Sequence, residues 1–338
     1  SAGIGVVSAV AIAVLGFAGP AQGASPLVDP AATGSITVHK FVQPASPTGL
    51  PANGTQVSTS GLTPIAGVGF QVRQVQGIDL TTNQGWTNAS SLSASFSAAN
   101  PETSITTAGY SLGSGTTKTT DASGVAAFTG LSVGLYLVKE TSAPSGATPA
   151  QPVLVSVPIT DPTNLNAWIY DVHIYPKNAI TAGTMSVNDT GAVKLGDPVT
   201  WQVTADIPNV TTIDGYQVVD VLDTNLTYQS ATVTLADGTV LNSGPADTTT
   251  TYDAPSRTLT VAFTAHGLGV LAAHPTTKVL VSIVTAANAV GTIANSALIY
   301  PNLASFNIAS GQPGGPAATP SAETHWGSIV LHQKDTSG

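Results

Sequence analysis

The chain has 338 residues, enough for two or three domains of ordinary size, and it contains no cysteine. Disulfides and thiolate zinc sites are therefore excluded. Only 8% of the residues are charged and the net charge is −9, which argues against nucleic acid or an anionic membrane surface as a partner. Short alternating segments rich in Thr, Ser, Val and Gly predict an all-β fold made of β-sandwiches.

The N-terminal segment, residues 1–24, has the character of a secretory signal peptide rather than of a folded element. Ile4 to Ala18 is almost uninterrupted in its small and apolar residues, yet it is too short to span a bilayer comfortably. Small residues follow Pro20, and cleavage is expected after Gly23 or Ala24. The alternative is a buried helix. With no basic leader before it, the chain is expected to begin inside the signal and to be secreted.

A disordered lead is predicted over residues 25–33, and the first domain over residues 34–178. Alternation of apolar and polar residues predicts strands at Ser35–Lys40, Val68–Val75, Gly124–Phe128 and Gly134–Glu140. Residues 44–61 are rich in proline and glycine and predict a loop. The polar residues 91–124 predict an insertion with little regular structure.

The last strand of this domain is predicted over residues 168–178, where side chains alternate between two faces. Lys177 then points to solvent and Asn178 to the core. An ordinary strand closed by a proline turn is the simplest account of the alternation alone. The spacing of its residues nevertheless resembles the pilin motif of the sortase-assembled pilus shaft proteins of Gram-positive bacteria. The residues that carry this resemblance are Trp168, Val172, Pro176, Lys177 and Asn178.

That resemblance implies a structural subunit of a covalent surface pilus, built from tandem Ig-like domains of the collagen-adhesin type. In this family the motif lysine, here Lys177, is the amine that a class C sortase joins to the next identical subunit. The sortase supplies the catalytic cysteine, so Lys177 acts only as the acceptor nucleophile. The implied location is the cell wall and pilus, and further implied partners are minor pilins and host surface ligands.

A second pattern, Tyr-x-x-x-Glu-Thr-x-Ala-Pro-x-Gly over residues 136–146, resembles the E-box of pilins and of collagen-adhesin B-type domains. In that family an early lysine, the E-box glutamate and a late asparagine form an intramolecular isopeptide bond. The matching residues here are Lys40, Glu140 and Asn178, all with inward parity. A buried lysine that loses its proton becomes a nucleophile, and a buried carboxylic acid can relay protons as ammonia leaves.

The alternative is that Glu140 is an exposed charge at a strand end and that Lys40 extends its ammonium into water along a packed stem. No bond forms in that case. If the bond does form, it closes a loop of well over a hundred residues, which stabilises the domain by about 5 kcal/mol in loop-entropy estimates. It would also carry tension directly between the first and last strands.

The second domain is expected over residues 183–303 and resembles the collagen-adhesin A-type domain of pilus shaft proteins. An isopeptide bond is common there as well. Asp220 and Asn295 have the parity that the family pattern asks for, but Met185 and Val187 occupy the inward positions of the first strand, where a lysine is expected. Asp220 and Asn295 are therefore expected to hydrogen-bond each other or the backbone without a covalent bond.

The tail is predicted to be a linker over residues 304–325, followed by the start of a truncated third domain over residues 326–338. Gly and Pro are frequent in the linker. The segment from Trp326 onward alternates as strands do and resembles the opening of another B-type domain. Lys334 is a doubtful bond-forming lysine there, because its strand parity differs by one.

An enzyme is the main competing class, but the six histidines are scattered and no H-E-x-x-H or G-x-S-x-G motif is present. His39 and His173 are expected on outward strand faces, in water. Beyond a self-catalysed bond, no enzymatic activity, cofactor or metal is expected. A minor or tip pilin, or a wall-anchored adhesin that binds host ligands, is the second competitor. The complete motif favours the shaft, because polymer growth needs an acceptor lysine in every subunit.

Overall fold

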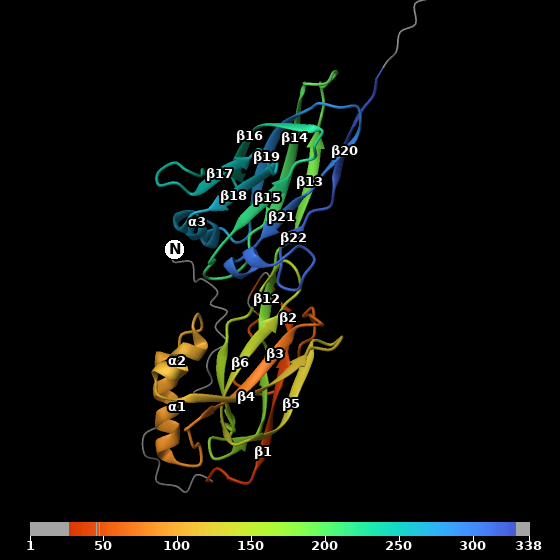
Figure 1. Cartoon of the computed structure of the whole chain (residues 1–338). Coiled ribbons are helices and arrows are strands. Elements are labelled where there is room, and N and C mark those ends of the chain that lie inside the picture. Colours follow the sequence, from red (N-terminus) through yellow and green to blue (C-terminus); the bar gives the residue numbers. More distant parts are fainter. Residues whose placement is uncertain (1–26, 45, 47, 329–338) are drawn as a thin grey trace, which may run out of the picture. The chain divides into compact units, whose positions relative to one another are not determined.

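The computed structural model describes residues 27–44, 46 and 48–328 and divides the chain into two compact units between Ile180 and Thr181. The predicted signal peptide, residues 1–24, lies outside the described residues. Within the described part of the chain, the helices are all too short or too polar to cross a bilayer. Figure 1 shows that strands dominate both units.

The first unit contains twelve strands and two helices in the described residues. In chain order they are β1 Thr33–His39, β2 Phe41–Val42, β3 Gly69–Gln76, α1 Asn83–Ser95, α2 Pro101–Thr107, β4 Ser111–Thr119, β5 Val125–Ser132, β6 Gly134–Ser142, β7 Ala147–Thr148, β8 Val153–Val157, β9 Ile159–Thr160, β10 Trp168–Ile169, β11 Asp171–Ile174 and β12 Lys177–Ile180.

Two sheets form a β-sandwich in this unit, which agrees with the predicted all-β class. One sheet has the order β4-β3-β6-β8 and is antiparallel throughout. The other has the order β11-β1-β5, in which β1 runs parallel to β11 and antiparallel to β5. Alternate side chains of both sheets meet in one apolar core, in which Ile36, Val38, Val72 and Phe128 are at most 3% exposed.

A helical layer covers the other face of the first sheet, so the prediction of an irregular insertion over residues 91–124 is wrong. Leu135 and Leu137 of β6 point away from the sandwich core and pack with Leu92 of α1 and Ile105 of α2. All four side chains are at most 1% exposed. The sequence obscured these helices because α1 is rich in Ser and Asn, and its apolar stripe is only three buried residues wide.

The lead before β1 is also more ordered than predicted, in the part that the structure describes. Val28 is only 6% exposed, and the backbone N–H of Asp29 donates to the hydroxyl of Tyr170 at 3.2 Å. The prediction of a disordered lead over residues 25–33 is therefore wrong from residue 27 onward. The apolar side chain anchors this segment, and the hydroxyl satisfies its backbone.

The predicted single strand over residues 168–178 is instead three short strands with three different partners. β10 pairs with β9, β11 runs parallel to β1, and β12 runs parallel to β2. Pro176 lies in the break between β11 and β12, where it cannot donate a backbone hydrogen bond. The partner strand breaks at the matching place, because Lys40 separates β1 from β2.

The second unit is a larger sandwich with one helix and one short 3₁₀ turn in the described residues. Its elements are β13 Gly183–Asn188, β14 Pro198–Asp206, β15 Gln217–Val221, β16 Leu226–Leu235, β17 Thr248–Asp253, β18 Thr258–Phe263, α3 Ala265–Ala273, β19 Lys278–Ala287, β20 Gly291–Asn295, β21 Ala297–Tyr300, η1 Leu303–Asn307, β22 Ala317–Ala318 and β23 Ala322–Trp326. Sheets of order β13-β14-β19-β16 and β17-β18-β15-β21-β22 enclose a core centred on Trp201.

The predicted linker over residues 304–325 is in part an integral piece of this second sandwich. β22 pairs with β21, and β23 pairs with β20 along five residues from Ala322 to Trp326. Thr319 and Thr324 are buried, and the Thr324 hydroxyl donates to Asp189 at 2.6 Å. Trp326 thus ends a strand of the second unit, and the rest of the predicted third-domain start, from residue 329, lies outside the described residues.

Candidate functional site

The first candidate site is built around Lys40, which is 0% exposed although it is a charged residue type. Its side chain points inward with Ile36 and Val38, and its backbone N–H donates to the Gly124 carbonyl at 2.7 Å. Burial lowers the pKa of Lys40 from 10.5 to about 8, and the nearby carboxylate of Glu140 limits that decrease. About a tenth of the amine is therefore neutral at pH 7.

Glu140 and Asn178 complete a closed triangle with this amine. Lys40 Nζ donates to Glu140 Oε2 at 2.8 Å and also to Asn178 Oδ1. Asn178 Nδ2 donates to Glu140 Oε1 at 2.7 Å, so one carboxyl group contacts both the amine and the amide nitrogen. The backbone N–H of Ala150 adds a further bond to Glu140 Oε2 at 3.1 Å.

Three different elements bring these side chains together from positions far apart in the sequence. Glu140 lies on β6 opposite Phe70 of β3, and the Glu140 side chain is 2% exposed. Asn178 lies on β12 and is 0% exposed. The alternative in which Glu140 is exposed and Lys40 reaches water does not fit this geometry. The Phe70 ring also lies 5.6 Å from Lys40 Nζ, so an aromatic face and two polar side chains surround the amine.

Lys177 has the opposite orientation from Asn178, as strand alternation predicts. It is half-buried, pairs with Phe41 of β2, and its Nζ donates to the Tyr175 carbonyl at 3.4 Å. Partial burial lowers the pKa of Lys177 below its ordinary value of 10.5. Lys177 is therefore only partly buried, unlike Asn178, and easier to deprotonate than a fully hydrated lysine.

The other motif residues contribute packing around this amine. Val172 and Pro176 are buried, and the Trp168 ring stacks on Trp86 of α1 with ring centres 5.3 Å apart. The contact between Trp168 and the helical layer could not be predicted, because α1 itself was missed. It ties the start of the motif to the outer layer of the unit.

A second buried acid–amide pair lies in the core of the second unit. Asn295 Nδ2 donates to Asp220 Oδ2 at 2.8 Å, and both residues are at most 4% exposed. Burial raises the pKa of Asp220 from 3.8 to about 7, although the bond from Asn295 opposes that increase. Within the described part of the chain, Asp220 Oδ1 has no hydrogen-bond partner. Met185 is 9% exposed and belongs to the same apolar core.

His39 and His173 are not solvated side chains, and in this respect the sequence-based expectation is wrong. Both are half-buried, and His39 Nε2 lies 2.9 Å from His173 Nδ1. The His39 ring also stacks on Tyr175, with ring centres 4.8 Å apart. The signal in the sequence is their position, because His39 directly precedes Lys40 and His173 lies five residues before Asn178.

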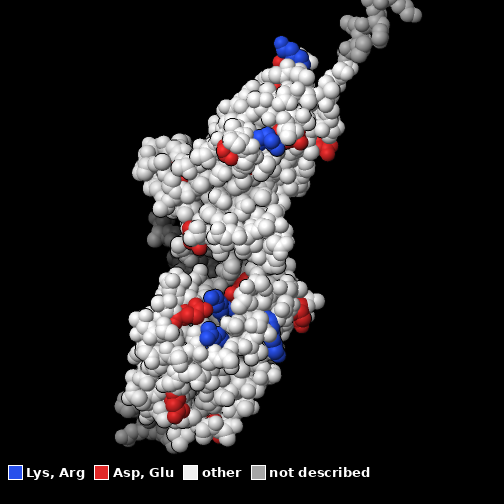
Figure 2. All heavy atoms as spheres, in the orientation of Figure 1, with Lys and Arg blue, Asp and Glu red and all other residues white. Residues whose placement is uncertain are grey.

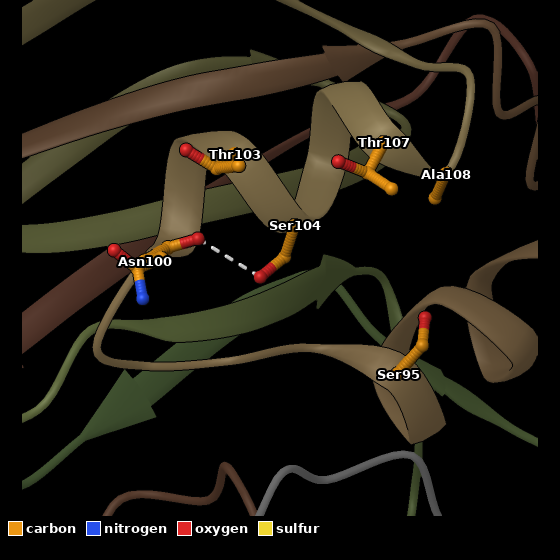
Figure 3. A pocket seen from close by; sticks show the side chains of 6 residues that line it. All are labelled: Ser95, Asn100, Thr103, Ser104, Thr107 and Ala108. Atoms are coloured by element: carbon orange, nitrogen blue, oxygen red, sulfur yellow. Dashed lines mark hydrogen bonds between the residues drawn. The ribbon is translucent and has the colours of Figure 1, made fainter.

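The surface offers little other chemistry. Figure 2 shows lysine, arginine and carboxylate side chains thinly scattered over a mostly uncharged surface. A shallow hollow lies between the end of α1 and α2, where the Ser104 hydroxyl donates to the Asn100 carbonyl at 2.9 Å (Figure 3). Its lining offers hydroxyl, amide and methyl groups: Ser95, Asn100, Thr103, Ser104, Thr107 and Ala108. These neutral groups are weak candidates for acid–base catalysis.

Tandem β-sandwiches, with a buried Lys–Glu–Asn triangle in the first, are the arrangement that the resemblance to Gram-positive pilins implies. Residues 31–179 match the family model described as Gram-positive pilin subunit D1, N-terminal domain. The first unit belongs to that family, and the resemblance to Gram-positive pilins is confirmed. The match covers β1 to β11 entirely and includes Lys40, Glu140, Lys177 and Asn178.

Two fimbrial proteins are similar in sequence. Fimbrial subunit type 1 of Actinomyces viscosus is 31% identical over 243 residues, which cover 68% of this chain and 44% of the relative. Fimbrial subunit type 2 of Actinomyces naeslundii is 29% identical over 351 residues, which cover 96% of this chain and 65% of the relative. The chain thus spans less than two thirds of the length of either relative.

Two solved structures of major pilins from Corynebacterium diphtheriae share the architecture. The full-length major pilin SpaD matches with a TM-score of 0.64 at 25% identity, over 88% of this chain and 68% of the pilin. The major pilin SpaA matches with a TM-score of 0.64 at 27% identity, over 86% of this chain and 69% of the pilin. The expected tandem β-sandwich fold is confirmed by these matches.

Proposed function

We propose that the chain is a shaft subunit of a covalent surface pilus, polymerised by a class C sortase through Lys177. The observation that carries the proposal is the pair of neighbours on β12. Asn178 is buried beside Lys40 and Glu140, while Lys177 is only half-buried and has the opposite orientation. The family of the first unit and the pilin relatives support the same function. The subunit would act outside the cell, on the wall and in the pilus.

The buried triangle is proposed to form an isopeptide bond within the subunit. The neutral Lys40 Nζ attacks Cγ of Asn178, and a new carbon–nitrogen bond forms as the Cγ–Nδ2 bond breaks. The Glu140 carboxylate accepts one proton from the amine and passes that proton on to Nδ2, so the leaving group is ammonia and the carboxylate is restored. The distances of 2.8 and 2.7 Å from the carboxyl oxygens to the two nitrogens support this relay. The chain catalyses one turnover, on itself.

Bond formation should accelerate as the pH rises and should level off above about pH 8, the pKa of Lys40. Only the neutral amine attacks, and about a tenth of it is neutral one pH unit below the pKa. Chain collected unfolded and unreacted from inclusion bodies can be refolded at a series of pH values, and intact mass then follows the loss of ammonia. With a pKa of about 8, the neutral fraction of Lys40 rises about 100-fold between pH 6 and 9. A rate that does not change over this range would contradict a deprotonated lysine as the nucleophile.

The acceptor role of Lys177 can be tested on this chain directly. The chain is incubated with a class C sortase and a peptide that carries a sorting sequence, and the modified lysine is located by peptide mapping. We expect one peptide added at Lys177 and none in Lys177→Arg, because arginine stays protonated. Lys139→Arg, which changes another partly exposed lysine of the same unit, is the control and should react normally. A product that persists in Lys177→Arg would contradict the shaft function. A minor pilin or an adhesin would then be the remaining functional candidate.

A further inference from the structure

Three outward side chains join β1 and β11, the strands that directly precede Lys40 and β12 in the chain. They are His39 of β1, His173 of β11 and Tyr175, which follows β11, and they are called the outer clamp below. His39 forms a hydrogen bond of 2.9 Å with His173, and their rings stack with centres 5.2 Å apart. The Tyr175 ring also stacks on the His39 ring, with ring centres 4.8 Å apart and an angle of 12° between the planes.

The clamp is itself fixed by neighbouring groups. The Tyr175 hydroxyl accepts the backbone N–H of Val57 at 2.9 Å, and the Gly54 carbonyl accepts the backbone N–H of His173 at 2.9 Å. His173 Nε2 lies 3.4 Å from the Asp171 carboxylate. Each ring therefore has a defined position before any covalent bond exists on the inner face.

The register between these strands needs such a contact. β1 and β11 pair in parallel over only four positions, and no hairpin turn connects them. Val38 pairs with Ile174, and Phe41 pairs with Lys177, so one register holds across the break. A shift by one residue would turn inward side chains outward and separate the Lys40 amine from its amide partner.

We propose that the outer clamp is the positioning device that holds β1 and β11 in the register in which Lys40 meets Asn178. Its role in bond formation rests on the proposed function, whereas its role in strand register does not. His39 directly precedes Lys40, and Tyr175 lies three residues before Asn178. Both side chains point to the outer face, so they act on the reactive pair through the backbone and touch no reacting atom. The clamp provides the alignment, and the bond makes it permanent.

The same geometry makes the clamp sensitive to acid. The two facing nitrogens share one proton, and a second proton between them would remove the hydrogen bond and leave a positive charge in a half-buried position. Burial, followed by the neighbouring His173, lowers the pKa of His39 below 6.5, while Asp171 opposes this change. The other charged groups nearby are Lys177, two residues after Tyr175, and Lys118, which donates to the Ala127 carbonyl of β5, the strand beside β1.

The sign of the effect follows from proton binding. Since the pKa of His39 is lower in the folded state, the unfolded chain binds more protons below about pH 6.5. The contribution of the clamp to stability is therefore present above that pH and decreases as the pH falls through it. The pairing of β1 with β11 should therefore weaken as the pH falls. Lys40 and Asn178 would then be less well aligned in acid than at neutral pH.

The test compares His39→Ala, which removes ring and hydrogen bond, with His39→Phe, which keeps a stacking ring but cannot titrate. Both are made in the full chain, with His325→Phe in β23 as the control for loss of an unrelated histidine. Ammonia loss is followed by intact mass during refolding at one fixed pH above 7. Melting of the first unit is followed from about pH 5 to 8, across the ordinary pKa of histidine.

We expect bond formation to slow at least about tenfold in His39→Ala, which loses one hydrogen bond and two ring contacts, with partial recovery in His39→Phe. The acid sensitivity of melting should disappear in His39→Phe and persist in His325→Phe. A merely structural role would lower stability equally at every pH and leave that sensitivity unchanged. Wild-type rates in His39→Ala, or unchanged acid sensitivity in His39→Phe, would overturn the proposal.

The two proposals fail in different ways. If the wild-type chain never loses ammonia, the internal bond is wrong, and the melting profiles alone decide the clamp. Acid sensitivity that His39→Phe removes then still supports a device that sets strand register. Acid sensitivity that survives His39→Phe overturns it whether or not the bond forms.

Discussion

Glu140→Gln is expected to leave the chain at its full sequence mass, without the loss of one ammonia expected for the wild type. Glutamine keeps the shape of the side chain, but it cannot accept the proton of the Lys40 amine or return one to Asn178. The two nitrogens that contact the carboxyl group, at 2.8 and 2.7 Å, would remain close together and unreacted. Intact mass of the refolded chain measures the result.

The loss of stability should be large because the bond would join residues 138 positions apart. Loop-entropy estimates for a crosslink of that span give about 5 kcal/mol. The variant also keeps a buried amine whose carboxylate partner is gone, which destabilises the native state further. Denaturant unfolding, followed by a probe of the first unit, should show a lower midpoint and a steeper slope, because the denatured state without the crosslink exposes more surface.

Glu102→Gln is a matched control on the same unit. Glu102 pairs with Lys139 at 2.9 Å, but both side chains are about 40% exposed, so the pair contributes at most about 1 kcal/mol. This variant should lose ammonia as the wild type does and unfold at nearly the same denaturant concentration. A Glu140→Gln chain that loses ammonia at the wild-type rate would show that the carboxyl group is not the proton relay.

Strand alternation predicted the inner and outer sides of the candidate site correctly. Lys40, Glu140 and Asn178 have inward parity in the sequence, and all three are buried together in the structure. Period-two alternation is informative here because the first unit buries one face of β1 against a core. The roles of these residues stay proposals, since geometry alone does not show a reaction.

The sequence was less informative where burial depended on a layer that had no clear pattern. β6 is buried at five successive positions because helices cover its second face, but the stripe that α1 contributes is weak. The outer clamp was missed for a related reason. Outward histidines are normally solvated, and only the parallel pairing of β1 with β11 brings His39 and His173 together. Sequence spacing cannot show which distant strand becomes a neighbour.

The linker prediction failed through composition. Residues 310–320 are rich in Gly, Pro, Ser, Thr and Ala, which is typical of linkers, yet the segment leads directly into β22 and β23. Short edge strands need little apolar sequence, because their backbone pairing with β21 and β20 supplies much of the contact. The pairing partner, again, is a property of the fold.

Asp220→Asn should stabilise the second unit at and above neutral pH, the opposite of what replacing a core residue usually does. In the wild type, burial raises the pKa of Asp220 from 3.8 to about 7. Between these values the unfolded chain releases the proton while the folded chain retains it, so folding stability falls as the pH rises. The full difference corresponds to about 4 kcal/mol, lost once the pH exceeds the folded pKa.

Asparagine at this position cannot ionise, so the variant should lose this dependence on pH and show a flat profile from about pH 4 to 8. The side-chain oxygen of the new asparagine can still accept the hydrogen bond from Asn295. Its amide nitrogen takes the place of Asp220 Oδ1, which has no hydrogen-bond partner among the described residues, so a buried donor is left without an acceptor. That unmet donor costs about 1–3 kcal/mol, so the net gain above neutral pH is smaller than the full difference. Below about pH 4 the same cost makes the variant less stable than the wild type.

The two profiles should therefore cross between acidic and neutral pH, and a crossing is difficult to produce by any general loss of packing. Asp253→Asn changes an exposed carboxyl group of the same unit and should leave the wild-type profile in place. Thermal or denaturant unfolding at several pH values, read from a probe in the second unit, gives both curves. Parallel curves for wild type and Asp220→Asn would mean that Asp220 ionises freely in the fold, and that its buried pairing with Asn295 does not control the stability of this sandwich.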